Sequence, residues 1–517
     1  MLDLVIADAL VLDGTGAPAF RGSVGVAGDR IAWVGEVGSA EPPAGRKIAA
    51  GGRTIAPGFI DVHNHSDLAP FVNPAMASTL RQGVTSVVVG NCGSSPWPEA
   101  GAAECALLVG GDPGSFAEGW PGFGAYLDAL DAARPGANVA ALVGHGAVRM
   151  QVMGRERRAP TDREIREMRA LVREAIGDGA VGLSTGLIYV PGIYSDTDEV
   201  VALAEVVVDG IYASHIRGEG EHLFRAISEA IEVGAKAETP VHVSHLKCET
   251  RLAWGRAGEL LERLRTGGDV TADQYPYTAW NSSLASLLPD WAPVAELERI
   301  LEGDHGRLRR AVEEGEETFQ SSVKGVGWDR IVIESSGDGR WNAKSVTEVA
   351  DGLSVDTFEA CVALLLEDPD TSCIGHPMAE ADVLEILADP EVFVASDGAA
   401  MSPEGPFGRT PVHPRNYGTF PRALELVRDE GLLSFEQAVR KMTSLPAARF
   451  GLAGRGTVAE GGYADLVVFD QEKVSDEASF DRPHVFPSGI DLVLVNGEIA
   501  WDGAVLGSRA GRALRRG

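Results

Sequence analysis

From residue 58 to about residue 450, short apolar runs alternate with amphipathic stretches, and this alternation constrains the fold more than any other feature. The stretches 161–179 and 221–234 carry apolar residues at every third or fourth position, which is the spacing of a helix with one buried face. Repeated strand–helix units place parallel strands side by side and helices outside them. The length of the alternation therefore predicts an α/β protein built on a (β/α)₈ barrel of the TIM type over residues 58–454.

The two ends of the chain have a different pattern. Residues 1–57 and 455–517 contain alternating apolar runs with glycine and proline turns and little helix, as in DLVIADALVLDG and DLVLVNGEIAWDG. We predict that both ends contribute antiparallel hairpins to one small β-sandwich domain. The charged, helical stretch of about 286–340 interrupts the strand–helix rhythm and is predicted to be an insertion near the barrel mouth.

Composition excludes several classes of function. A formal net charge of −30 argues against partners such as nucleic acids and anionic membranes. No stretch approaches the roughly 20 apolar residues that would span a bilayer, and acidic Asp3 and Asp8 stand where a secretory signal would be basic or apolar. Five cysteines are too few for a disulfide framework in a chain of 517 residues. We expect a soluble cytoplasmic protein with reduced thiols, and its oligomeric state stays open.

Residues that can bind a metal follow the apolar runs. The predicted strand in FIDVHNHSD carries two histidines two positions apart, a spacing that places both side chains on one face. Others follow the runs TSVVVGNCG, GIYASH, PVHVSH and VFVASD. A single histidine in such a position is more often a packing residue than a ligand, but all strand ends of a parallel barrel open on one face. The predicted metal ligands are His63, His65, Cys92, His215, His245 and Asp397.

Longer motifs extend this pattern to a known family. HNH after APGF, then SH, SH and SD, together with TSLPAARFGLAGRGTVAEGGYADLVVFD, resemble the amidohydrolase superfamily from end to end. GNCGSSPWP, STGLIYVPG, ASHIRGEG, SHLK, QYPYTA and HPRNYGTFPR resemble the N-acyl-D-amino-acid deacylases, or D-aminoacylases. The resemblance implies a barrel with a small β domain and with zinc at the strand ends.

The distribution of lysine supports the narrower resemblance. Many amidohydrolases bridge two metals with a carboxylated lysine on a middle strand, but no lysine occurs between Lys47 and Lys236. Cys92 is the natural substitute, because a thiolate together with the imidazoles of His215 and His245 gives zinc three ligands and an open position. The resemblance implies that His63, His65 and Asp397 form a second, more weakly held position.

Chemical roles follow from this arrangement. Zinc lowers the pKa of water, and Asp397 is the candidate to accept the water proton and return it to the amide nitrogen. Tyr189 is the candidate to polarise the carbonyl, with Tyr194 as the alternative. Lys247 either contacts a polar substrate side chain or forms a local salt bridge. The loop after Asp397 is expected to touch the substrate side chain, and its unusual content, with Met401, Pro406 and Phe407, leaves the choice of substrate open.

The resemblance also implies a substrate clamp. Tyr277, Ser283 and Arg415 would hold the substrate α-carboxylate, and arginine suits this role because it binds a carboxylate through two parallel hydrogen bonds. We predict zinc-dependent hydrolysis of small-molecule N-acyl-D-amino acids, in which the preference for D over L rests on the resemblance. A dipeptidase or cyclic-amide hydrolase is the alternative among enzymes. A non-catalytic barrel relative is the alternative from another class.

Overall fold

Parallel strands form the centre of the computed structural model, which describes residues 1–102, 105, 106, 116, 119–316, 319–405, 408 and 412–516. They make two sheets, with the orders β17-β13-β12-β11-β10-β9 and β21-β8-β7-β6. The strands are β6 Phe59–Asp61, β7 Val84–Val89, β8 Asn138–Ala141, β9 Val143–Gly144, β10 Gly182–Gly186, β11 Ile211–His215, β12 Val241–Val243, β13 Val270–Gln274, β17 Val392–Val394 and β21 Ala513–Leu514.

Backbone hydrogen bonds join the two sheets at both seams. Val181 N donates to Ala141 O (2.9 Å) at one seam, and Asp397 N donates to His63 O (2.8 Å) at the other. The predicted α/β core of parallel strands is present, but the predicted barrel is not one continuous closed sheet. The ladder breaks at Leu142, between β8 and β9, and it breaks where the chain leaves β6 and β17 for the loops that carry His63 and Asp397.

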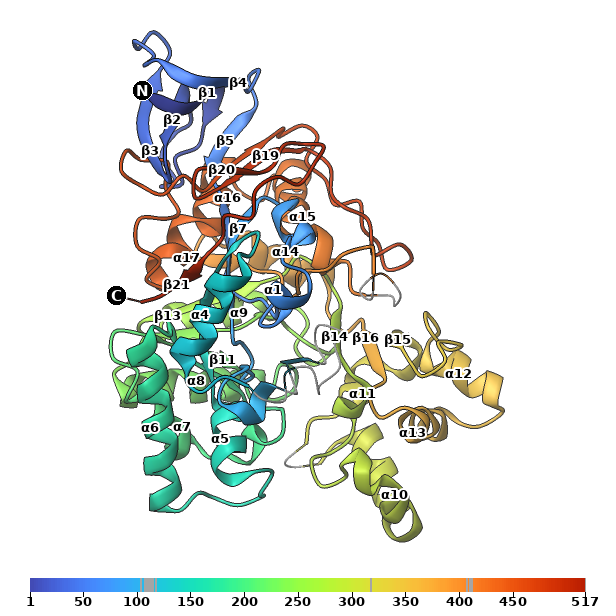
Figure 1. Cartoon of the computed structure of the whole chain (residues 1–517). Helices are drawn as coiled ribbons and strands as arrows, with labels where there is room; N and C mark the ends of the chain where they lie inside the picture. The colour runs from blue at the N-terminus through green and yellow to red at the C-terminus, as the bar shows by residue number, and fades with distance from the viewer. Residues whose placement is uncertain are drawn as a thin grey trace.

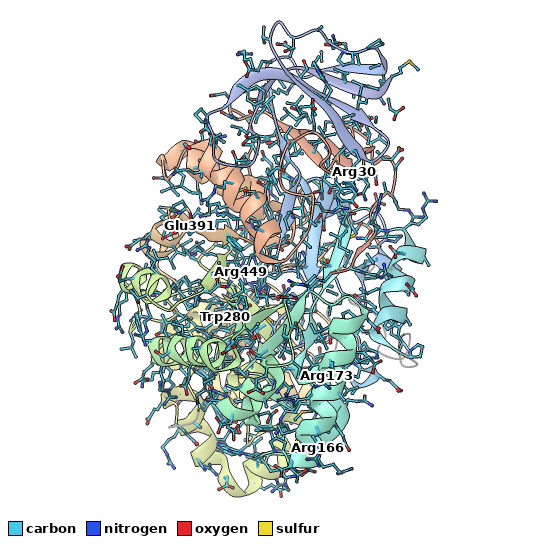
Figure 2. All side chains as sticks on the ribbon, turned by 90° about the vertical axis from the view of Figure 1, so that its left-hand side faces the viewer. Arg30, Arg166, Arg173, Trp280, Glu391 and Arg449 are labelled. Atoms are coloured by element: carbon cyan, nitrogen blue, oxygen red, sulfur yellow. The ribbon has the colours of Figure 1, made fainter. Side chains whose placement is uncertain are left out.

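Helices connect and cover the parallel strands, and those predicted at 161–179 and 221–234 are confirmed as α6 and α8. Thr161 and Glu164 form a reciprocal capping box at the start of α6, and Gly179 ends the helix in a left-handed conformation. Arg166 and Arg173 lie on the outer side of α6 (Figure 2). The helices are α1 Ala69–Val72, α2 Ala77–Leu80, α4 Phe123–Ala133, α5 His145–Met153, α6 Asp162–Asp178, α7 Thr197–Ala204, α8 Leu223–Ala237, α9 Ala257–Arg265, α14 Glu380–Leu387, α15 Arg415–Glu430, α16 Phe435–Met442 and α17 Ser444–Arg449.

The two ends of the chain meet in one sheet of the order β20-β19-β18-β5-β1-β2-β3, with β4 paired to β1 (Figure 1). Antiparallel pairing of β18 with β5 joins them. The strands therefore make one sheet and not the two sheets of the predicted sandwich. Within this sheet β1 has a bulge at Asp8 and pairs with β4 along its first half and with β5 along its second half. The strands are β1 Leu2–Val11, β2 Phe20–Ala27, β3 Arg30–Glu36, β4 Ala44–Ala49, β5 Thr54–Pro57, β18 Leu466–Phe469, β19 Ile490–Val495 and β20 Glu498–Trp501.

A separate antiparallel sheet of the order β14-β16-β15 interrupts the chain between β13 and β17. This segment packs an apolar core of its own and extends to one side of the molecule (Figure 1). The insertion predicted at about 286–340 lies inside this longer segment. Its elements are β14 Trp280–Ser283, α10 Leu297–Glu314, α11 Ser322–Val326, β15 Ile331–Ser335, α12 Val346–Leu353, α13 Thr357–Glu367 and β16 Ser372–Gly375. Within the part of the chain described above, no helix is long and apolar enough to cross a membrane.

Candidate metal centre

The six predicted ligands converge at the carboxyl ends of the parallel strands. His215 is the last residue of β11, whereas the other five lie in the loops two to four residues beyond their strands. This placement differs from the prediction that the HxH pair lies within a strand. Three groups of three residues could each hold a metal ion, because their ligand atoms all lie within 4.8 Å of one another. They are His63, His65 and Cys92; Cys92, His215 and His245; and His63, His245 and Asp397.

Cys92 lies at the centre of this cluster. Its Sγ is 3.3 Å from His63 Nε2, 3.5 Å from His215 Nδ1 and 3.6 Å from His245 Nε2. Two ligands bound tetrahedrally to one zinc ion, at Zn–S of about 2.3 Å and Zn–N of about 2.0 Å, would be about 3.5 Å apart. Thiolate and imidazole are also ligand types that zinc prefers. The sulfur–nitrogen spacing and the chemistry of the residues present therefore fit a zinc ion, while His215 Nδ1 and His245 Nε2 lie 2.8 Å apart, at hydrogen-bond distance.

Asp397 occupies the other side of the cluster. Its Oδ1 is 3.1 Å from His65 Nε2 and 3.4 Å from His63 Nε2, and the histidine rings are 5.3 Å apart. His63 thus contacts both Cys92 and Asp397. Two histidines and a carboxylate therefore form a second set of candidate ligands next to the first. The carboxylate supplies an oxygen donor, which the first set lacks.

Three of these residues have a left-handed backbone. Cys92 has φ 54°, His245 has φ 36° and Asp397 has φ 49°, in a region that residues with a side chain rarely adopt. Such conformations cost free energy, persist where surrounding structure holds them, and concentrate at functional sites. Gly186 of β10 supplies part of this support, because a Cβ there would collide with the carbonyl oxygen of Cys92.

Electrostatics favour ionised ligands. Burial alone would raise the pKa of the Cys92 thiol, but His63 and hydrogen bonds from His215 and His245 outweigh it and hold the pKa well below its ordinary value. Burial would likewise raise the pKa of Asp397, but the Arg415 guanidinium and the nearby histidines hold it well below its usual range. Both groups are therefore available as anionic ligands at neutral pH.

Two carboxylates that the sequence analysis did not identify contact the histidines from outside the cluster. Glu219 Oε1 is 3.0 Å from His245 Nδ1. Asp273 Oδ1 accepts a hydrogen bond from His245 N (2.8 Å), and Asp273 Oδ2 is 3.6 Å from His63 Nδ1. Outer carboxylates of this kind fix the ring orientation of metal-binding histidines. The signal for Glu219 was its position in RGEG, directly after a ligand strand.

Tyr189 lies next to the ligand cluster, whereas Tyr194 makes a different contact. The Tyr189 ring packs edge-to-face on His215, with 4.9 Å between ring centroids. Burial and the negative charges of Cys92 and Asp397 raise the pKa of Tyr189 well above its ordinary value, so its hydroxyl remains a hydrogen-bond donor. Tyr194 instead donates to the carbonyl oxygen of Asp290 (3.3 Å).

The predicted substrate-binding residues have different surroundings. Arg415 Nη1 donates to Asp397 Oδ2 (2.8 Å), and Lys247 Nζ donates to Glu219 Oε1 (2.7 Å), so both cations border the ligand cluster. Tyr277 donates to Asp476 Oδ2 (2.7 Å).

Ser283 lies in the insertion, where its Oγ accepts a hydrogen bond from Ala285 N and caps a 3₁₀ turn. Tyr275 was not predicted, yet its ring lies 5.1 Å from the Arg415 guanidinium and 5.6 Å from Lys247 Nζ. Its buried hydroxyl has no hydrogen-bond partner among the residues that the structure describes. Of the loop predicted to touch the substrate, Pro406 and Phe407 lie outside the described residues.

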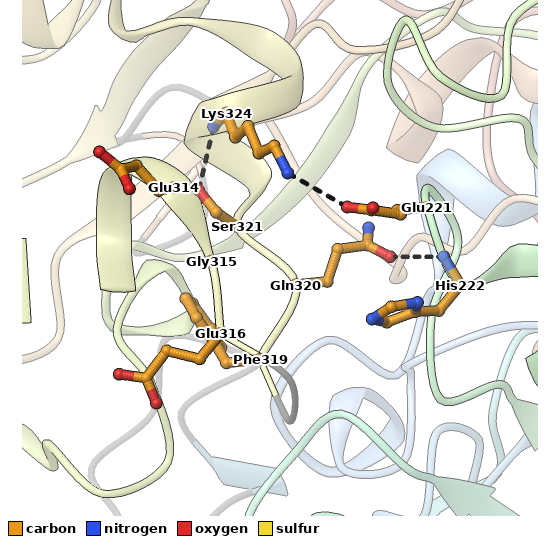
Figure 3. Close-up of a pocket in the computed structure, with 9 residues that line it drawn as sticks. All are labelled: Glu221, His222, Glu314, Gly315, Glu316, Phe319, Gln320, Ser321 and Lys324. Carbon is orange, nitrogen blue, oxygen red and sulfur yellow. Dashed lines mark hydrogen bonds and ion pairs between the residues drawn. The ribbon is translucent and has the colours of Figure 1, made fainter. Parts of the chain in front are cut away.

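A pocket of 360 Å³ lies beside this centre, between the loop after β11 and the insertion (Figure 3). Gln320 Oε1 accepts a hydrogen bond from His222 N (3.2 Å), and Lys324 Nζ donates to Glu221 Oε2 (3.3 Å). None of the predicted site residues that the structure describes lines the pocket. The insertion therefore braces the loop that carries Glu219.

Comparisons with known proteins agree with this geometry. The amidohydrolase family model matches residues 46–294 and 383–500. The chain is 38% identical to an N-acyl-D-glutamate deacylase of Alcaligenes xylosoxydans xylosoxydans, over 100% of this chain and 97% of the relative. It is 37% identical to a D-aminoacylase of the same organism, over 99% and 98%.

Solved structures give the same result. A crystal structure of N-acyl-D-glutamate deacylase from Bordetella bronchiseptica, complexed with zinc and a phosphonate mimic of the tetrahedral intermediate, has a TM-score of 0.83 at 34% identity, covering 99% of each chain. A structure of D-aminoacylase, solved to examine the functional role of its binuclear metal centre, has a TM-score of 0.84 at 36% identity, covering 100% of each chain.

Proposed function

The chain belongs to the amidohydrolase family, within the group of D-aminoacylases and N-acyl-D-amino-acid deacylases, and we propose that it hydrolyses N-acyl-D-amino acids to a carboxylate and a free D-amino acid. The observation that carries this proposal is the cluster centred on Cys92, which brings a thiol, four imidazoles and a carboxylate together at the strand ends. Full-length similarity to deacylases adds the class of substrate.

We propose zinc as the metal. Cys92, His215 and His245 would form the tight site, and His63, His65 and Asp397 would form a second, weaker position. When bound, zinc supplies a Lewis acid that polarises a carbonyl and acidifies water. The low pKa of the Cys92 thiol supports the first set, because a thiolate is needed to bind the metal.

The chain's own residues would then position the substrate and move its protons. Asp397 accepts a proton from the attacking water and returns it to the amide nitrogen as the C–N bond breaks. Tyr189 donates a hydrogen bond to the oxygen on which negative charge develops. Arg415 binds the substrate α-carboxylate, and the pairing of Arg415 with Asp397 supports this role, because it places the guanidinium next to the proton acceptor. Tyr277, Ser283 and Lys247 are the further proposed contacts.

We also infer the larger arrangement around the site. The two parallel sheets would be parts of one (β/α)₈ barrel over residues 58–454, supported by the backbone hydrogen bonds at both seams. Residues 1–57 and 455–517 would form the small β domain. The substrate would be a small molecule, and a cytoplasmic location would keep the thiols reduced, which is consistent with the absence of a disulfide bond among the described residues.

A panel of substrates tests the proposal. The zinc-loaded protein is incubated with matched N-acetyl-D- and N-acetyl-L-amino acids, and the free amine is measured. We expect release from D-substrates and at least tenfold less from their L-enantiomers. Hydrolysis of dihydropyrimidines or dipeptides in preference to N-acetyl-D-amino acids would contradict the proposal.

A further inference from the structure

The charges around the ligand cluster indicate which substrate side chain the site accepts. Resting on the proposed function, we propose that the enzyme prefers N-acyl-D-amino acids with a neutral side chain and discriminates against acidic ones such as D-glutamate and D-aspartate.

Among the residues that the structure describes, Lys247 and Arg415 are the side-chain cations next to the cluster, and both already have anionic partners. Lys247 is buried, and its Nζ donates to Glu219 Oε1 (2.7 Å) and lies 2.9 Å from His245 Nδ1. Arg415 is buried and donates to Asp397 Oδ2 (2.8 Å). In the proposed reaction Arg415 is needed for the substrate α-carboxylate. A second carboxylate would therefore have to compete with Glu219 for Lys247.

Two further buried carboxylates, Glu249 and Glu334, lie near Lys247 and Arg415. Glu249 follows Lys247 on the same loop, where its N–H donates to Glu219 O (2.9 Å) and its Oε1 accepts from Trp280 Nε1 (2.8 Å). Glu334 of β15 accepts from Ser372 Oγ (2.7 Å), and its charge interacts with that of Arg415. An acidic substrate side chain would thus enter a region in which the described residues supply more carboxylates than cations. Like charges in a buried site repel strongly because little solvent screens them.

The titration of Glu249 gives independent support. Burial and the nearby charge of Glu219 raise the pKa of Glu249 to about 7. Burial also raises the pKa of Glu334 above its ordinary value, although Arg415 and hydrogen bonds oppose this rise. The shift of Glu249 indicates that another negative charge is unfavourable beside Glu219.

The apolar groups nearby suit a neutral side chain. Tyr275, Tyr277, Met378 and Val383 form a buried cluster, and Met378 pairs with Glu249 through a backbone bridge. The ring of Tyr275 lies close to both Lys247 and Arg415. An unbranched or aromatic neutral side chain could bury its carbon atoms against this cluster without desolvating a charge.

A pair of nearly isosteric substrates tests the proposal. N-acetyl-D-glutamine and N-acetyl-D-glutamate differ by one amide in place of a carboxylate, and kcat/KM is measured for both with the zinc-loaded enzyme. We expect D-glutamine to be hydrolysed at least tenfold more efficiently. Equal efficiency, or a preference for D-glutamate, would overturn the inference. Hydrolysis of neither these substrates nor any other N-acetyl-D-amino acid would instead overturn the proposed function on which it rests.

Single-charge variants locate the cause. Glu249→Gln and Glu334→Gln keep acceptors for Trp280 and Ser372 but remove a negative charge, so each should narrow the ratio of D-glutamine to D-glutamate efficiency by at least threefold. The matched control is Glu302→Gln, which removes one charge from an exposed position on α10 of the same insertion and should leave the ratio unchanged. Melting curves establish that each variant is folded. An unchanged ratio in both Glu249→Gln and Glu334→Gln would contradict the electrostatic origin of the preference.

Discussion

At the scale of single residues, Arg415, the proposed substrate clamp, contacts Asp397, the proposed proton acceptor. Arg415 Nη1 is 2.8 Å from Asp397 Oδ2, while Asp397 Oδ1 faces His65 and His63. One carboxylate oxygen thus faces the proposed metal ligands and the other faces the proposed substrate clamp. Each residue can be tested separately. The proposed role of Asp397 affects every amide substrate, whereas the proposed role of Arg415 affects only substrates that carry an α-carboxylate.

Asp397→Asn keeps the shape of the side chain but removes its ability to accept a proton. We expect turnover to fall by roughly 10²-fold or more, the scale of general acid–base catalysis, because the proton of the attacking water then has no acceptor. Steady-state kinetics gives the rate and elemental analysis gives the zinc content. The tight zinc should remain, and turnover at the parent rate would require another base.

Arg415→Lys keeps the positive charge but loses the planar pair of N–H groups. The loss of a charge-assisted hydrogen bond in a dry pocket should cost about 1.5–3 kcal/mol, or roughly one to two powers of ten in kcat/KM for an N-acetyl-D-amino acid. The control substrate carries a primary amide in place of its α-carboxylate, and the two proteins should hydrolyse it nearly equally. An equal loss on both substrates would mean that Arg415 acts through Asp397 and does not bind the carboxylate.

The sequence predicted which residues meet at the cluster but not all of their neighbours. The ligands could be identified because strand ends of a parallel sheet share one edge, whatever the intervening helices do. Glu219 and Tyr275 were missed because their contacts depend on how two loops fold back after β11 and β13. Ser283 was predicted from resemblance alone, and its capping contact depends on the direction that β14 takes into the insertion.

At the scale of elements, β10 packs against the loop after β7 and holds Cys92 in position. Ser184 of β10 accepts a hydrogen bond from Gly93 N (3.0 Å), and Gly186 packs directly on the Cys92 carbonyl. The alternation of parallel strands with helices followed from apolar periodicity. The breaks in the ladder did not, because they arise where loop residues turn to present ligands and not from any change in hydropathy.

Gly186→Ala tests this packing. The added methyl group would collide with backbone atoms that cannot move aside easily, so Cys92 should shift and zinc affinity should fall at least tenfold in a chelator competition assay. The matched control is Gly177→Ala in α6, where no atom lies within 4 Å of the added methyl group. Alanine there should keep zinc affinity and stabilise the helix by up to about 1 kcal/mol. Full zinc affinity in Gly186→Ala would refute the packing argument.

At the scale of the whole molecule, a buried polar network connects the terminal sheet to the parallel strands. Asp465, just before β18, forms an ion pair with Arg455 and accepts a hydrogen bond from Asn496 N (2.7 Å). Asn138 of β8 donates to Asp465 and accepts from Asn496 Nδ2 (2.7 Å). The C-terminal strands are thereby tied to the strand sheet that carries Cys92 and His63.

Asp465→Asn should destabilise the whole protein. The change leaves Arg455 buried without its anion, and breaking a buried ion pair typically costs about 3–5 kcal/mol. The midpoint of urea unfolding should fall accordingly, while Glu472→Gln at an exposed position nearby should leave it unchanged. An unchanged midpoint for Asp465→Asn would show that the network does not contribute to the stability of the fold.

The dependence of activity on bound zinc tests the central claim most directly. The protein is stripped of metal with a chelator and titrated with zinc, and the amine released from N-acetyl-D-methionine is measured against zinc bound per chain. Activity should be absent without metal and should rise in step with the first equivalent, because Cys92, His215 and His245 form the tighter of two proposed positions. Full activity in the metal-free protein, or no activity after one equivalent has bound, would contradict the account.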